Sequence, residues 1–128
     1  MELELKRLEP VMIAIQGKEY PARMPNRAMK ELAEMWQIKY FGLFQKLATD
    51  TLELDEIFDV LFVTLKAGGV NVTRDMFEDM DHDAEFINTA TLKIIELFDR
   101  SQKVESALEE NELGNDDKKK PEAAETPD

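Results

Sequence analysis

Residues 54–65 carry one continuous stripe of large apolar side chains at helical spacing. Its members recur three or four residues apart: Leu54, Ile57, Phe58, Leu61, Phe62 and Leu65. The charged residues of this segment lie largely off the stripe: Asp55, Glu56, Asp59 and Lys66. A helix with one apolar face is stable only when that face is covered by other elements. The segment therefore predicts an amphipathic helix in a packed core, ended by the glycine pair Gly68-Gly69, which supplies a left-handed residue.

The first two dozen residues alternate apolar and polar side chains, which is typical of strands. Three apolar residues share one face of an extended run: Val11, Ile13 and Ile15. Gly17 supplies a tight turn before residues 20–24 return, so we expect a β-hairpin. Leucines within residues 1–10 leave open a third strand at the start. A lone hairpin is marginally stable in water, so the following segments must cover one face of it.

Two helices are expected between the hairpin and the stripe. The first has Asn26 as its N-cap, and its apolar side chains follow helical spacing: Met29, Leu32, Ala33 and Trp36. The second carries five large apolar residues: Tyr40, Phe41, Leu43, Phe44 and Leu47. Gly42 lies inside this second helix and lowers its helix propensity.

A short helix and a long helix are expected after Gly69. Thr73 caps the short helix, and the carboxylate of Asp75 favours the positive end of its dipole. Its expected buried residues are Met76, Phe77 and Met80. The long helix turns a second stripe inward: Ile87, Ala90, Thr91, Ile94, Ile95 and Phe98. Beyond it the apolar residues thin to Val104, Ala107 and Leu108, so we expect this end to project from the body.

The C-terminal segment differs in composition from the rest of the chain. Residues 114–128 contain no large apolar side chain, so their burial cannot offset the entropy of ordering them. We therefore expect one domain over residues 1–112 and a disordered acidic tail over residues 113–128. The expected fold class is α+β and mainly α, with an N-terminal β-hairpin packed on a bundle of four to five helices.

The charge balance is strongly acidic. The chain has 28 acidic and 16 basic residues, which gives a net charge of −12. Nucleic acids and anionic membranes attract basic proteins and repel acidic ones, so neither is expected as a partner. A basic or amphipathic protein is the expected partner.

The residue inventory leaves few forms of catalysis open. The chain has no cysteine and a single histidine, His82. Disulfides, thiolate metal sites, cysteine nucleophiles and metal sites with two imidazoles are therefore excluded. The N-terminus alternates charge with leucine, unlike a signal peptide, and no apolar run is long enough to cross a bilayer. We expect a cytoplasmic protein.

Two acidic features fail as sites. The cluster Asp79, Asp81, Asp83 and Glu85 begins like a calcium loop. However, its sixth position is Ala84 where such a loop needs glycine, and its twelfth is Ala90 where it needs glutamate. His82 lies between two aspartates, but no nucleophile or phosphate-binding loop accompanies it. We expect no catalytic residue, metal site or cofactor, and therefore no enzyme.

One aromatic group supplies the candidate binding residues: Trp36, Tyr40, Phe41 and Phe44. Two interpretations remain open. The rings fill the space between hairpin and helices, or some of them line an exposed groove that receives a helix of a partner. The projecting end of the last helix adds Val104 and Leu108 to this candidate partner-binding set.

The order of elements resembles a known family. The similarity lies in four stretches: Ile13-Ala14-Ile15-Gln16-Gly17-Lys18-Glu19-Tyr20, Ala28-Met29-Lys30-Glu31-Leu32, Leu65-Lys66-Ala67-Gly68-Gly69 and Val72-Thr73-Arg74-Asp75-Met76-Phe77. With the last helix, they resemble the tail assembly chaperones of long-tailed, siphovirus-like bacteriophages and prophages over residues 12–98. The longer lead of residues 1–10 and the rich aromatic group depart from the family pattern.

The resemblance implies a function without catalysis. Proteins of that family bind and solubilise the tape measure protein and promote assembly of tail tube protein around it. They act in the host cell cytoplasm and are absent from the mature virion. Many also exist as a longer frameshifted product, and the lysine run at residues 118–120 is a candidate slippage site. Self-association is left open.

Two other functions compete with this interpretation. An acidic protein of this size is also suited to be a nucleic-acid mimic, which inhibits a host DNA-binding enzyme by occupying its basic groove. A mimic should array its carboxylates along a continuous rigid surface, whereas the sequence scatters them over outward helix faces and the tail. A structural component of the virion is the third interpretation.

Overall fold

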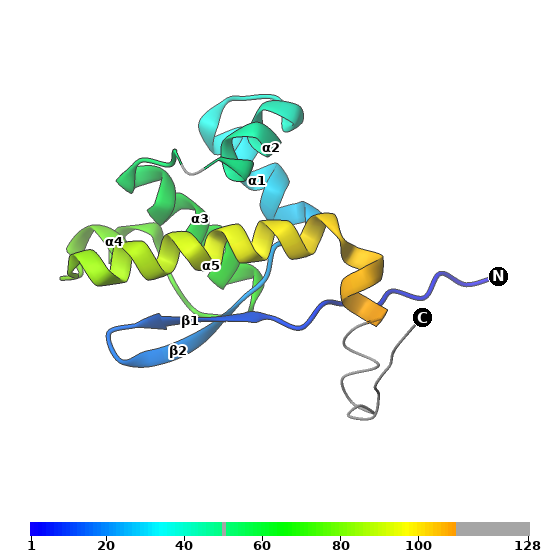
Figure 1. Ribbon diagram of the computed structural model, residues 1–128, viewed down its shortest axis with the longest axis horizontal. Coiled ribbons are helices and arrows are strands. Elements are labelled where there is room, and N and C mark those ends of the chain that lie inside the picture. The colour runs from blue at the N-terminus through cyan, green and yellow to red at the C-terminus, as the bar shows by residue number, and fades with distance from the viewer. Residues whose placement is uncertain (50, 110–128) are drawn as a thin grey trace, which may run out of the picture.

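The structure is a computed structural model that describes residues 1–49 and 51–109 (Figure 1). Its elements in chain order are β1 (Val11–Ile15), β2 (Lys18–Ala22), α1 (Asn26–Trp36), α2 (Tyr40–Ala48), α3 (Leu54–Ala67), α4 (Arg74–Asp79) and α5 (Ala84–Gln102). A further helical segment, residues 104–109, follows a turn at Lys103. The α+β, mainly helical class is confirmed, but residues 1–10 form no third strand. The expected boundary at residue 112 and the tail lie outside the described residues.

The two strands form the expected antiparallel hairpin, but the second strand begins at Lys18, two residues earlier than the expected residues 20–24. Ile13 pairs with Tyr20 and Ile15 with Lys18, which leaves Gln16 and Gly17 as a two-residue turn. Both turn residues have positive φ, 49° and 87°, a geometry that matches the right-handed twist of the strands. The Gln16 side chain donates a hydrogen bond to the carbonyl oxygen of Asp81, 3.1 Å away, and so joins the hairpin tip to the link between α4 and α5.

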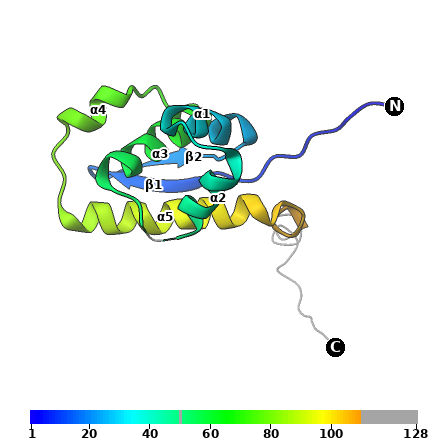
Figure 2. The same ribbon diagram turned by 90° about the horizontal axis from the view of Figure 1, so that it is seen from above.

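The hairpin buries one face under two helices. β1 packs against α5, and β2 packs against α3 (Figure 2). Val11 and Ile13 are buried beneath them, while Met12 and Ala14, which alternate with them along the strand, are exposed. The exposed sheet face and the helical layer thus lie on opposite sides of the hairpin, as a half-covered sheet requires.

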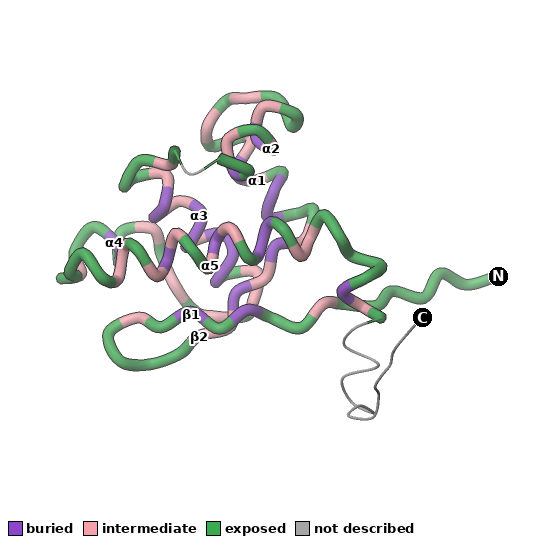
Figure 3. Tube along the Cα trace, viewed as in Figure 1, coloured by how far each residue is buried: buried purple, intermediate pink, exposed green. Residues whose placement is uncertain are grey.

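Helix α3 lies at the centre of the core (Figure 3). It packs against β2, α1, α4 and α5, and it buries more residues than one stripe: Ile57, Phe58, Val60, Leu61, Val63, Thr64 and Leu65. The hydroxyl of Thr64 is satisfied by donating to the carbonyl oxygen of Val60, 2.7 Å away. Leu54, at the first turn, is exposed, which corrects its assignment to the buried stripe.

The helix ends differ in part from expectation. Pro25 is the N-cap of α1, and Asn26 is the first helical residue, so the expected Asn26 cap is wrong. Thr73 is the N-cap of α4, as expected, but its side chain makes no capping hydrogen bond. Glu53 and Glu56 form a reciprocal capping box at the start of α3, which propensity alone did not indicate.

Two expected packing assignments are corrected. Met76 is 50% exposed because α4 has only six residues, of which only Phe77 is buried. The C-terminal end does not project as one continuous helix. The chain breaks at Lys103, and residues 104–109 turn back beside the segment that leads into β1, with Ala107 only 7% exposed (Figures 1 and 2). No helix in the described ranges has both the length and the apolar character needed to cross a bilayer.

Gly68 is the point of closest approach between α3 and the hairpin. A Cβ added at Gly68 would overlap with the carbonyl oxygen of Pro21. The neighbouring backbone is fixed as well, because the amide of Arg23 donates to the carbonyl oxygen of Thr64 at 2.9 Å. Neither backbone can retreat without breaking this contact, so position 68 has room only for glycine.

We expect Gly68→Ala to lower the free energy of unfolding by about 2–3 kcal/mol, because overpacking against rigid backbone costs this much. Gly42→Ala is the matched control, since its added Cβ meets nothing closer than Ile38 at 3.9 Å. In mid-helix it should stabilise by about 0.5–1 kcal/mol. Urea unfolding of both variants measures the difference, and equal effects would contradict the close approach.

Candidate protein-binding site

The corner between α1 and α2 is built by a left-handed residue. Gln37 follows the last residue of α1 with φ 53°, and its amide donates to the carbonyl oxygen of Glu34, 3.2 Å away. The next amide, from Ile38, donates to the carbonyl oxygen of Ala33 at 3.1 Å. These hydrogen bonds satisfy backbone carbonyl groups at the C-terminal end of α1, and the chain turns sharply there. As a result, α2 begins beside α1.

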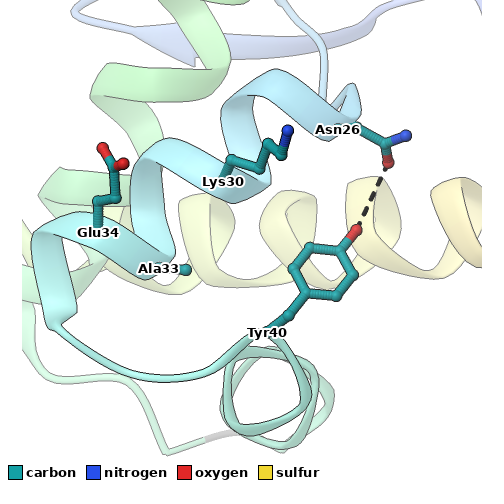
Figure 4. A pocket seen from close by; sticks show the side chains of 5 residues that line it. All are labelled: Asn26, Lys30, Ala33, Glu34 and Tyr40. Atoms are coloured by element: carbon teal, nitrogen blue, oxygen red, sulfur yellow. Dashed lines mark hydrogen bonds between the residues drawn. The ribbon is translucent and has the colours of Figure 1, made fainter.

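A groove of about 590 Å³ lies at this corner, and we call it the α1–α2 groove. Its lining residues come from α1 and from the first residue of α2: Asn26, Lys30, Ala33, Glu34 and Tyr40. Figure 4 shows Tyr40 reaching across to α1, where its hydroxyl donates to Asn26 Oδ1 at 3.4 Å. The groove thus combines an aromatic ring and a methyl group with polar groups of both charge signs.

Two neighbouring aromatic residues of α2 are exposed. Phe41 is 72% exposed and Tyr40 is 42% exposed. The buried face of α2 is formed by Leu43 and Leu47, which leaves the ring of Phe41 directed toward solvent. An exposed phenylalanine beside a groove is typical of a protein-binding surface. We define the α1–α2 surface as the groove residues together with Arg27, Lys39 and Phe41.

The other two aromatic candidates have structural roles. The indole Nε1 of Trp36 donates to Asp59 Oδ2 at 2.7 Å, and the side chain is half-buried. The ring of Phe44 packs against Tyr40 and Phe98, with ring centroids 4.7 and 5.5 Å away. The structure divides the aromatic group: Trp36 and Phe44 are half-buried and held by contacts within the domain, whereas Tyr40 and Phe41 are exposed.

The C-terminal candidates lie elsewhere. Val104 is 43% exposed and Leu108 is half-buried, both in the segment 104–109. Figure 1 places this segment near the start of β1, on the opposite side of α5 from α2. The structure therefore does not bring Val104 and Leu108 together with Tyr40 and Phe41.

A polar network behind the site escaped prediction from sequence. Asp59 Oδ1 accepts a hydrogen bond from Arg74 Nε at 2.7 Å, while its other oxygen accepts the bond from Trp36. Arg74 Nη1 also donates to Glu78 at 2.8 Å, and the guanidinium lies over the ring of Phe58. One carboxylate thus connects α1, α3 and α4.

Arg74 remains charged in this network. Burial lowers the pKa of Arg74, but hydrogen bonds and attraction from Asp59 and Glu78 outweigh it, so the pKa is raised. A raised pKa keeps the Arg74 guanidinium protonated throughout the physiological pH range. Arg74 therefore supplies a positive charge to this network at neutral pH.

The acidic link before α5 serves the fold. Asp83 Oδ1 accepts the amide of Phe86 at 3.0 Å and so caps α5. The ring of His82 packs against Phe58 and Phe86, at centroid distances of 5.8 and 5.7 Å. Among residues 1–49 and 51–109, no three acidic or histidine side chains are grouped so that they could hold a metal ion.

Comparisons of the chain with protein-family models, with curated proteins and with solved structures found no match. The resemblance to tail assembly chaperones therefore stays a prediction from the sequence.

Truncation of Phe41 and truncation of Phe44 should change the free energy of unfolding by very different amounts. Phe44→Ala removes two ring contacts and should lower the free energy of unfolding by about 2 kcal/mol. Phe41→Ala removes an exposed ring and should change it by less than about 0.5 kcal/mol. Thermal unfolding of the two variants measures this, and a large loss with Phe41→Ala would place that ring in the core.

Removal of the Asp59 carboxylate should leave two half-buried donors, Trp36 Nε1 and Arg74 Nε, without this acceptor. We expect Asp59→Ala to cost about 2–3 kcal/mol in the free energy of unfolding. In a Trp36→Phe background the cost should fall by about 1 kcal/mol, because the indole donor is already absent. Additive effects in this double-mutant cycle would show that the two side chains do not interact.

Proposed function

We propose that this protein is a non-catalytic assembly chaperone that binds a helical client protein through the α1–α2 surface. The client we propose is the tape measure protein of a long-tailed phage, in the host cell cytoplasm, with tail tube protein as the second partner. The observation that carries the proposal is the exposure of two adjacent aromatic residues, Tyr40 and Phe41, beside a groove.

The physical basis is the match between an exposed aromatic groove and an amphipathic helix. Such helices bind by inserting apolar side chains, spaced three or four residues apart, into a groove of this kind. Exposed rings are also the residues that most often dominate binding energy at interfaces. A long apolar-striped helical client aggregates when its stripes are exposed, so a bound acidic domain would cover a stripe and add charge repulsion.

The proposed cycle is passive. Binding covers the client without a chemical step, and we infer that the polymerising tail tube subunits then displace the chaperone by competition. Release by competition needs an interface that can exchange, which suits a small groove with two aromatic contacts better than a large apolar interface.

The nucleic-acid mimic is the weaker alternative because ion pairs neutralise several carboxylates. Glu31 pairs with Lys66 at 2.7 Å, and Glu56 pairs with Lys46 at 2.8 Å. Arg74 pairs with both Asp59 and Glu78. A mimic needs a continuous row of unpaired carboxylates to capture a basic cleft. The pairing interrupts such a row on the faces of α1, α3 and α4.

The test is co-purification from cells that express the protein with its native gene neighbourhood. The N-terminally tagged protein should recover a long helical tail protein, identified by mass spectrometry. Phe41→Ala should reduce that recovery about tenfold, the effect of losing an interface anchor worth about 1.4 kcal/mol. Leu92→Ala is the matched control, since Leu92 is 67% exposed on α5, outside the α1–α2 surface.

Two outcomes would contradict the proposal. Recovery of a basic DNA-binding enzyme without a tail protein would favour the mimic. Equal recovery of a tail protein by the Phe41→Ala and Leu92→Ala variants would show that the client binds away from the α1–α2 surface.

A further inference from the structure

Within residues 1–49 and 51–109, the basic residues of the α1–α2 surface form no ion pair. Elsewhere in the described part of the chain, basic side chains that pair with carboxylates include Lys46, Lys66, Arg74, Lys93 and Lys103. Arg27, Lys30 and Lys39 are exposed and form no ion pair or hydrogen bond within the part of the chain that the structure describes. Three positive charges are therefore available to a ligand at this surface.

These charges lie next to the exposed rings. Lys30 lines the groove, as Figure 4 shows, and Arg27 lies one turn before it on α1. Lys39 is the N-cap of α2 and directly precedes Tyr40 and Phe41. Glu34 is the one carboxylate of the surface, so three cations stand against one anion. The local charge is positive although the chain carries −12.

We propose that the α1–α2 surface selects an acidic amphipathic helix. This inference rests on the proposed function and specifies the chemistry of the client segment. Apolar side chains of the bound helix contact Tyr40, Phe41 and Ala33. Carboxylates on the flanks of its stripe pair with Lys30 and Lys39. Of the two partners that the net charge suggests, a basic or an amphipathic protein, the proposal keeps the amphipathic one and makes it acidic.

The other acidic residues near this surface do not cancel its local charge: Glu31, which follows Lys30 on α1, is paired with Lys66 at 2.7 Å, and the acidic link before α5 is distant. The link at Asp83 lies at one end of α5, and Phe98, which contacts Phe44 of α2, lies near the other end. Fifteen residues of helix span roughly 20 Å. Charges at the surface are screened over about 8 Å at physiological ionic strength. The charges of the surface itself are therefore those of Arg27, Lys30 and Lys39 against that of Glu34, which leaves two net positive charges.

Two synthetic peptides supply the probes. Both carry the same leucine stripe at helical spacing, one with glutamates and the other with lysines at the flanking positions. Binding to the full-length protein is followed by fluorescence anisotropy of the labelled peptides at low and physiological salt. The acidic peptide should bind about fivefold tighter than the basic one, and added salt should weaken it.

Two matched charge-reversal variants test whether the preference for the acidic peptide arises at the α1–α2 surface. Lys30→Glu should weaken the acidic peptide about fivefold. Lys18→Glu changes the net charge equally, at an exposed strand residue that lies outside the surface, and should leave the affinity within about twofold. Phe41→Ala should weaken both peptides, because both use the same apolar contact.

The outcomes separate this inference from the proposed function. Tighter binding of the basic peptide would overturn the acidic preference, and so would equal effects of Lys30→Glu and Lys18→Glu. If Phe41→Ala still weakened binding in that case, the proposed binding surface would remain supported. Absence of binding by both peptides overturns both. Self-association that Lys30→Glu abolishes, seen by sedimentation of the protein alone, would assign the surface to a second copy and overturn the client helix.

Discussion

The burial of α3 is the constraint on which the rest of the molecule depends. Four elements, β2, α1, α4 and α5, pack directly on it. Its C-terminal end meets the hairpin so closely that backbone contacts backbone at Gly68, and the carbonyl oxygen of Thr64 accepts the amide of Arg23. Because α1 leaves the hairpin only a few residues after this contact, the direction of α1 is set by α3. The position of the corner that forms the α1–α2 groove therefore also depends on α3.

The elements that local periodicity specifies could be predicted from the sequence. The hairpin, the stripe of α3 and the inward face of α5 follow from spacing, because one buried face leaves a repeat of two or of about 3.6 residues. The predictions that were wrong concern burial that is determined by neighbouring elements in the fold. Val60 and Val63 are buried because elements surround α3, and Met76 is exposed because α4 is too short to bury two faces.

The candidate site was predictable only in part, for the same reason. The sequence identified the aromatic group but could not separate its half-buried members from its exposed members. Trp36 and Phe44 are held by partners that lie 23 and 54 positions further along the chain. Asp59 lies at the edge of the stripe, where a carboxylate is typical of a solvated face. Its two acceptor oxygens are used because Trp36 and Arg74 approach from separate helices. The unpaired cations at the groove likewise become visible only when the paired ones elsewhere have been identified.

The packing of β1 against α5 also has a consequence for how the chain acquires its structure during synthesis. Ile13, which is fully buried, lies on the first strand, whereas the helix that covers this strand is α5, which follows the other named elements and ends at Gln102. The ribosome adds about 5–20 residues per second, so the hairpin waits several seconds for its cover. Over the same interval α1, α2 and α3 can already associate. The surface proposed to bind a client therefore belongs to elements that are synthesised before α5. The packing of α5 on the hairpin completes the domain afterwards.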